Sequence, residues 1–226
     1  MKYKNISTKF KSEDDDDDDI KQSEMYLSFA KRTQVAHQIS IHIDEPIRSA
    51  KYYRSIVQEL GDLTENDEVI FRINSPGGEL NGLVALLEAI RNCDAEILGV
   101  ITGQAHSAAS MLALSCPNVA ITPSANMLVH FVSFGAGGKA WDVISSVHHT
   151  VDYSTSIFRE IYQGFLTEDE MQNIIEGKEL WLQAPEIEER LIKRQEFYQK
   201  KEAEEEQPEK PKKKKPSDIE LNKSTK

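Results

Sequence analysis

The chain has 226 residues, with 38 acidic against 27 basic side chains and a formal net charge of −11 at pH 7. This length accommodates one ordinary domain with a sizeable core plus tails. The negative charge argues against nucleic acid as the main partner, because phosphate binding needs a basic face. No stretch approaches the apolar length of a membrane span, so we expect no membrane association.

Charged runs lie near both ends of the sequence. Six consecutive aspartates occupy Asp14 to Asp19, and residues 199–216 carry an acidic block followed by KPKKKK. Such runs repel themselves and bury no apolar surface. We therefore expect a disordered acidic segment over 1–31, one folded domain over 32–195, and a charged, disordered tail over 196–226. The tails are either solvated or docking segments for a partner.

The two cysteines, Cys93 and Cys116, give no disulfide framework, and neither has the spacing of a metal site. The N-terminus lacks the apolar run of a signal peptide. We expect a reducing, cytoplasmic compartment and no metal or organic cofactor.

Strand and helix patterns alternate along the chain. HQISIHI (His37 to Ile43) alternates polar and apolar residues, and a helical pattern follows Pro46. EVIFRI (Glu68 to Ile73) is rich in strand-forming residues, and after it apolar side chains recur at helical spacing from Leu80 to Ile90. Later elements are predicted as a strand in EILGVITG, a helix in GQAHSAASMLALS, strands in NVAITP and ANMLVHF, a long helix from Trp141 to Phe165, and helices from Thr167 and Ala184. This order indicates an α/β domain with a mostly parallel sheet covered by helices.

Two strand-to-helix turns lie where α/β proteins place their ligand sites. The glycines of NSPGG either direct backbone N–H groups into a cleft or form a tight turn. In TGQAHSA, Ser107 opens a helix, where unpaired N–H groups favour a developing negative charge. The serine is either a nucleophile or an N-cap.

A serine nucleophile needs a base to take its proton and donors to hold the oxyanion. His130 ends the predicted ANMLVH strand, from which it can fold back toward Ser107. A histidine in this position is either a structural residue or that base.

These residues resemble the proteolytic subunit of the Clp protease and its phage-encoded relatives. RINSPGG, GQAHS and MLVH are similar to the family's INSPGG, GxAAS and MIH, and the spacing from Gly78 to Ser107 matches the family's usual spacing. GGKAWDV and LWLQAPEI resemble two further family segments, so the likeness spans roughly Arg32 to Ile192.

The resemblance implies repeated β-β-α units, as in the fold shared with crotonase-like proteins. It also implies a serine endopeptidase in which Ser107 is the nucleophile, His130 the general base, and the N–H groups of Gly78 and Ala108 the oxyanion hole. Further implications are protein or peptide substrates, a homo-oligomer of stacked rings, and an AAA+ unfoldase as partner. Two alternatives are a phage head-maturation protease of the same fold and a catalytically inactive ring-forming homologue.

The chain departs from the family pattern at three places. Ile175 occupies the position of the triad aspartate, so either a shifted acid or a Ser-His dyad is implied. His106 replaces an alanine before the serine, where its side chain either crowds or assists the site, and EERLIKRQ replaces the usual ending with a charged helix. The other acids in the region are Glu176, Glu179, Asp152 and Asp169.

Overall fold

A computed structural model describes residues 36–205 of the chain. The expected acidic segment over residues 1–31 and the basic run KPKKKK lie outside the described residues. The last helix continues past the expected start of the charged tail at residue 196 and ends at Glu205.

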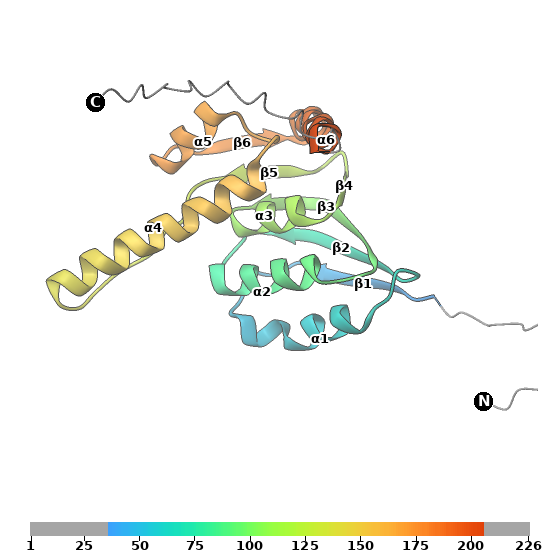
Figure 1. Cartoon of the computed structure of the whole chain (residues 1–226), viewed down its shortest axis with the longest axis horizontal. Coiled ribbons are helices and arrows are strands. Elements are labelled where there is room, and N and C mark those ends of the chain that lie inside the picture. The colour runs from blue at the N-terminus through green and yellow to red at the C-terminus, as the bar shows by residue number, and fades with distance from the viewer. Residues whose placement is uncertain (1–35, 206–226) are drawn as a thin grey trace, which may run out of the picture. The chain divides into compact units, whose positions relative to one another are not determined.

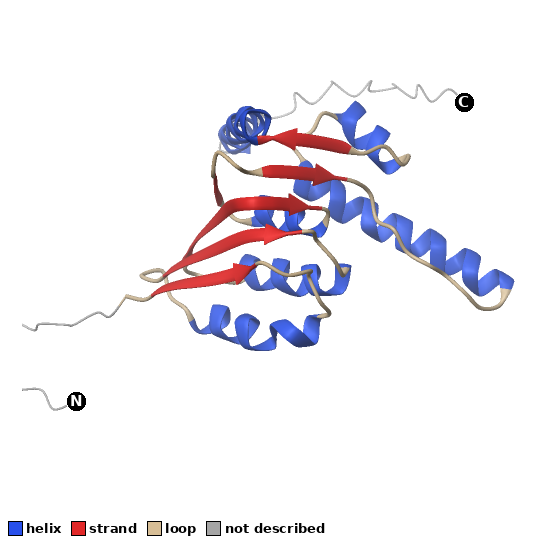
Figure 2. Cartoon of the chain, turned by 180° about the vertical axis from the view of Figure 1, so that it is seen from behind, coloured by secondary structure: helices blue, strands red, loops and turns tan. Residues whose placement is uncertain are grey.

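The centre of the fold is one six-stranded sheet. Its path runs β1-β2-β3-β5-β6, with β4 paired to β3 beside β5. All pairings are parallel except β5 with β6, and Figure 2 shows the edge strand β6 running opposite to β5. The strands are β1 (Gln38–Ile43), β2 (Glu68–Ser75), β3 (Glu96–His106), β4 (Asn118–Ile121), β5 (Asn126–Val129) and β6 (Leu180–Gln183).

Helices cover one face of this sheet, as Figures 1 and 2 show from opposite sides. The helices are η1 (Ala50–Tyr53), α1 (Arg54–Asp62), α2 (Leu80–Arg91), α3 (Ala108–Ser115), α4 (Ala140–Tyr162), α5 (Glu168–Ile175) and α6 (Ala184–Glu205). Within residues 36–205, none of them combines the length and apolar character needed to cross a bilayer. The predicted α/β class with a mostly parallel, helix-covered sheet is confirmed.

Strand periodicity explains why the core forms on the helix side. In β2, Val69, Phe71 and Ile73 are fully buried, while the alternating Arg72 is exposed. Successive strand side chains point to opposite faces, so this one set packs beneath the helices. Each fully buried aliphatic or aromatic side chain of this kind contributes about 1.5–3 kcal/mol.

Three elements differ from the sequence prediction. The stretch GQAHS does not open as a helix: β3 continues to His106, and α3 begins only at Ala108. The helical pattern after Pro46 begins as η1 at Ala50, because the preceding residues run extended and Ile47 forms a β-bridge with Gly78. The short strand β6 had not been predicted.

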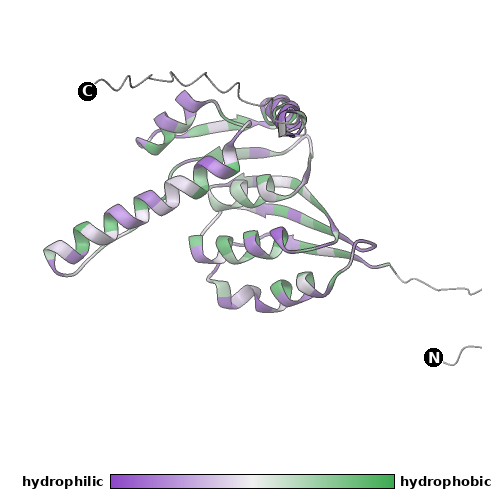
Figure 3. Cartoon of the chain, in the orientation of Figure 1, coloured by the Kyte–Doolittle hydropathy of each residue, from purple (hydrophilic) through white to green (hydrophobic). Residues whose placement is uncertain are grey.

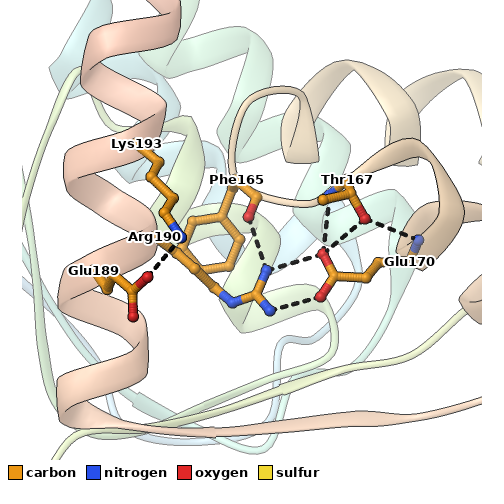
Figure 4. Close-up of polar contacts among 6 residues, drawn as sticks. All are labelled: Phe165, Thr167, Glu170, Glu189, Arg190 and Lys193. Carbon is orange, nitrogen blue, oxygen red and sulfur yellow. Dashed lines mark hydrogen bonds and ion pairs between the residues drawn. The ribbon is translucent and has the colours of Figure 1, made fainter.

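An ion pair joins α5 to α6 beside the sheet (Figure 4). Arg190 donates to both carboxylate oxygens of Glu170, at 2.6 and 3.0 Å, and to the carbonyl of Phe165 at 3.1 Å. Glu170 also accepts from the backbone N–H of Thr167 at 2.9 Å, which completes a capping box at the start of α5. The hydrogen bond from Arg190, aided by Thr167, lowers the pKa of Glu170 to about 2.

We predict that Glu170→Gln lowers the free energy of unfolding at pH 7 by about 1–3 kcal/mol, because it breaks a partly buried, charge-assisted pair. A carboxyl group with a depressed folded pKa stabilises the fold above its unfolded pKa, and this contribution disappears as the pH falls toward the folded value. The difference between wild type and variant should therefore shrink from pH 4.5 toward pH 2, the folded value being about 2.

Urea unfolding across this pH range measures the effect. Glu168→Gln is the matched control, since Glu168 is 77% exposed in its pair with Arg159 and such surface pairs contribute little. Equal stability of Glu170→Gln and wild type at pH 7 would contradict the assigned role of the pair.

Candidate active site

The carboxyl ends of the parallel strands gather on one side of the sheet, toward which their arrows point in Figure 2. A pocket of about 790 Å³ lies there. Its lining includes all four residues predicted from the sequence as site residues: Gly78, Ser107, Ala108 and His130. Helix α4 closes one side of the pocket with Thr150, Ser154 and Phe158.

The pairing of β3 with β5 brings the serine and the histidine to the same pocket. The end of β3 pairs in parallel with the start of β5, His106 opposite Leu128. The backbone N–H of Ser107 then donates to the carbonyl of Leu128 at 2.8 Å. His130 lies two positions beyond Leu128, immediately after β5 ends, as predicted.

Ser107 has an unusual backbone conformation for a residue with a side chain. Its φ is 54° and its ψ −124°, and it is the only non-glycine residue with positive φ between residues 36 and 205. Such a conformation costs about 1–3 kcal/mol and persists only when surrounding contacts enforce it. Ser107 is the N-cap residue of α3, yet its side chain makes no capping hydrogen bond. The capping role considered for this serine therefore lacks its defining contact.

Two polar side chains at the end of β2 hydrogen-bond to the backbone around the glycine turn and the end of β3. The register of β2 against β3 shifts after Ile73, and Asn74 Oδ1 fills the irregularity by accepting from the N–H of Gln104 at 3.0 Å. A bulge of this kind redirects the strand that carries it. Buried Ser75 donates to the carbonyl of Glu45 at 2.7 Å and accepts from the N–H of Gly77 at 3.2 Å. Neither residue belongs to the site predicted from the sequence.

The two glycines approach neighbouring backbone too closely for a side chain. A Cβ on Gly77, where φ is +87°, would lie 2.5 Å from the carbonyl oxygen of His106 and 2.8 Å from Ser107 Cβ. A Cβ on Gly78 would lie 2.1 Å from the carbonyl oxygen of Ile47. The glycine turn is thus pressed against the serine turn, and each glycine is required there.

Two backbone donors remain free at this junction. Among the described residues, neither the Gly78 N–H nor the Ala108 N–H has a hydrogen-bond acceptor. Ala108 is the first residue of α3, and the first N–H groups of a helix lack acceptors within it. Both residues line the pocket beside Ser107, so their N–H groups are available to an acceptor bound in it.

His130 has a defined tautomer. Its Nδ1 lies 2.7 Å from the backbone carbonyl oxygen of Phe131. A carbonyl oxygen only accepts hydrogen bonds, so Nδ1 carries the proton and Nε2 of the neutral ring is left as an acceptor. The Ser107 hydroxyl makes no hydrogen bond within residues 36–205, neither to His130 nor to any other group. The two residues share the lining of one pocket without contacting each other through a hydrogen bond.

The acids considered as replacements for the missing aspartate lie elsewhere. Ile175 packs against the core, and Glu176 accepts a hydrogen bond from Gln172 at 2.8 Å. Glu179 accepts from the indole of Trp181 at 3.3 Å. Asp152 and Asp169 are exposed. Among residues 36–205, Glu79, which follows the glycine pair, is the only carboxylate in the pocket lining.

The polar side chains of His106 and Ser110, close to Ser107 in the sequence, make their hydrogen bonds outside the pocket. His106 does not line the pocket; its Nε2 lies 2.6 Å from Asn126 Oδ1, and its ring meets Trp181 edge-on. The imidazole of His106 therefore contacts Asn126 and Trp181 outside the pocket lining. Ser110, one turn further along α3, is fully buried and donates to the carbonyl of Ser107 at 2.6 Å. Its proton is already donated, so Ser110 offers no free hydroxyl to the pocket.

Residues 22–195 match the model of the Clp protease family. The chain therefore belongs to the Clp protease family, a family of peptidases that act on protein substrates and typically form oligomeric rings.

We predict that Gly77→Ala lowers the free energy of unfolding by at least about 2 kcal/mol, because a Cβ at this positive φ collides with the backbone of the serine turn. Urea unfolding measures the change. Gly61→Ala is the matched control: a Cβ there meets nothing within 4 Å, and the substitution in α1 should stabilise by about 0.5–1 kcal/mol. Similar stabilities for the two variants would show that the glycine turn is not sterically constrained.

Proposed function

We propose that this chain is a serine endopeptidase of the Clp proteolytic-subunit type, acting through a Ser107–His130 dyad. One observation carries the proposal. The uncommitted hydroxyl of Ser107 lies in the same pocket as a histidine whose Nδ1 is held as a donor, which leaves Nε2 free to accept a proton.

The proposed reaction uses these groups in the following order. His130 Nε2 takes the proton of Ser107 as the serine oxygen bonds to the carbonyl carbon of a peptide. The carbonyl oxygen becomes an oxyanion, which the N–H groups of Gly78 and Ala108 stabilise. The imidazolium then gives its Nε2 proton to the departing amine, and an acyl-enzyme remains. Water, deprotonated by the same nitrogen, releases the acid and restores the serine.

The carbonyl of Phe131 supplies part of what a triad acid supplies. It fixes the tautomer and the direction of the ring through the 2.7 Å hydrogen bond. It carries a partial rather than a full negative charge, so it stabilises the imidazolium less than a carboxylate does. We therefore infer a dyad whose rate lies below that of a complete triad but well above that of the uncatalysed reaction.

We predict that Ser107→Ala lowers peptide hydrolysis by at least about 10³-fold without unfolding the chain, since the attacking oxygen is lost. An active-serine phosphonate should label wild type at Ser107 and leave the variant unlabelled, as mass spectrometry of the adduct reports. A folded wild-type protein that forms no adduct would favour the alternative, an inactive ring-forming homologue.

Glu176→Gln provides the control for this prediction. Glu176 bonds to Gln172 outside the pocket, so its variant should stay within about threefold of wild type, whereas His130→Ala should lose about as much activity as Ser107→Ala. If Glu176→Gln instead matched His130→Ala, Glu176 would be a relocated triad acid and the dyad assignment would be wrong.

We further propose a homo-oligomer of stacked rings that interlock through α4. No residue in the first half of α4 is buried, and Trp141 is 79% and Ile144 44% exposed. Figure 3 shows hydrophobic positions continuing along this half, which extends away from the sheet in Figure 1. Exposed apolar side chains in such a row are typical of an interaction surface. An AAA+ unfoldase as partner belongs to the same proposal, and a capsid-maturation role is the alternative to it.

We predict an oligomeric mass for wild type at micromolar concentration and a smaller mass for Ile144→Asp, because a buried, unpaired charge opposes association. Sedimentation velocity measures both. Gln58→Asp, which adds the same charge on the exposed face of α1, is the control and should keep the wild-type mass. A monomeric wild type would contradict the proposed assembly.

A further inference from the structure

Two buried hydroxyl groups lie behind the nucleophile. Tyr162, near the end of α4, is 1% exposed, and Ser110 of α3 is 0% exposed. Their oxygens are 2.5 Å apart, although the residues are 52 positions apart in the sequence. The mechanism above uses neither group.

The direction of the hydrogen bonds follows from the acceptors. Ser110 Oγ lies 2.6 Å from the backbone carbonyl oxygen of Ser107 and 3.4 Å from that of Leu128. Both oxygens only accept, so the single proton of Ser110 is donated to a carbonyl, and the shorter contact is to Ser107. The proton between the two hydroxyls must then come from Tyr162. The chain Tyr162 O–H to Ser110 O–H to the Ser107 carbonyl is thus one directed relay, and successive hydrogen bonds of this kind strengthen one another.

This relay ends at Ser107, the residue whose positive φ is unfavourable for a side-chain-bearing residue. The Ser107 carbonyl also accepts from the N–H groups of Ser110 and Met111, at 3.0 and 3.3 Å. The hydroxyl of Ser110 makes the shortest of the three contacts, and Tyr162 holds that hydroxyl in place. Several hydrogen bonds to one carbonyl can hold a serine at a positive φ that it would not otherwise adopt.

The ring of Tyr162 is linked to the histidine side of the pocket through two phenylalanine rings. It packs on Phe158 with centroids 4.5 Å apart, and Phe158 meets the ring of Phe131 edge-on at 5.9 Å. Phe131 is the residue whose carbonyl holds His130 Nδ1. One side chain of α4 is therefore connected to both residues of the proposed dyad. Its hydroxyl leads through Ser110 to Ser107, and its ring leads through Phe158 to Phe131.

We propose that Tyr162 is a positioning residue for the reaction, acting through Ser110 on the backbone of Ser107. This inference rests on the proposed function for its kinetic consequence, and on the geometry alone for its structural one. Tyr162→Phe tests it selectively, because the substitution removes the hydroxyl and keeps the ring that packs on Phe158.

The experiment compares full-length wild type, Tyr162→Phe, Ser110→Ala and the double variant. We expect Tyr162→Phe to lower kcat and the rate of phosphonate labelling about tenfold, with KM within twofold, because a misplaced nucleophile slows the chemical step more than binding. The final extent of labelling should equal that of wild type, which a partly unfolded sample would not achieve. The double variant should be no slower than Ser110→Ala, since the hydroxyl of Tyr162 acts through Ser110.

Hydrogen exchange of the segment 103–115 supplies a readout that needs no activity, and Tyr162→Phe should accelerate it. Tyr153→Phe is the matched control, because Tyr153 lies on the same helix but is 42% exposed. Wild-type rates and exchange in Tyr162→Phe, or losses that add in the double variant, would overturn the inference. A wild type that neither hydrolyses nor labels while Tyr162→Phe still accelerates exchange would refute the proposed function and leave the positioning role supported.

Discussion

The site depends on the way β3 changes partners along its length. Its first part pairs with β4, Leu98 opposite Asn118, while its last residues pair with β5. The change leaves the end of β3 between β2 on one side and β5 on the other. Hydrogen bonding of a parallel pair fixes register to the residue, so the Ser107 turn and the end of β5 are held at a constant offset. This pairing places Ser107 and His130 in the lining of one pocket.

The strand ends could be predicted from the sequence because their signals are local. Alternating apolar residues define β1 and β2, and Pro76 with two glycines marks the turn after β2. The end of β3 was misjudged because Ala105, His106 and the following small residues suit a helix as well as a strand. The segment forms a strand because it pairs with β5, which is a tertiary contact. Strand β6 could not be predicted because four residues are too few to show the alternation of polar and apolar side chains that marks a strand.

The candidate site was predictable in its side chains and not in its supporting contacts. Ser107, His130 and Gly78 lie at turns that a sequence pattern can locate, and they line one pocket. The partner of His130 Nδ1 is a backbone carbonyl, which every residue possesses, so no residue type could indicate it. Tyr162 and Ser110 lie on different helices and meet only through the packing of α3 against α4. Contacts of this kind require the tertiary structure.

The glycine turn has a consequence for how relatives of this chain are compared. Gly77 is confined by the backbone of His106, and Gly78 by that of Ile47, before any substrate enters. Purifying selection on folding alone would therefore retain both glycines in a lineage that had lost peptidase activity. The motif PGG is thus a marker of ancestry and of folding. If the proposed dyad is right, homologues that retain the chemistry are recognised by residues 107 and 130 and not by the glycine pair.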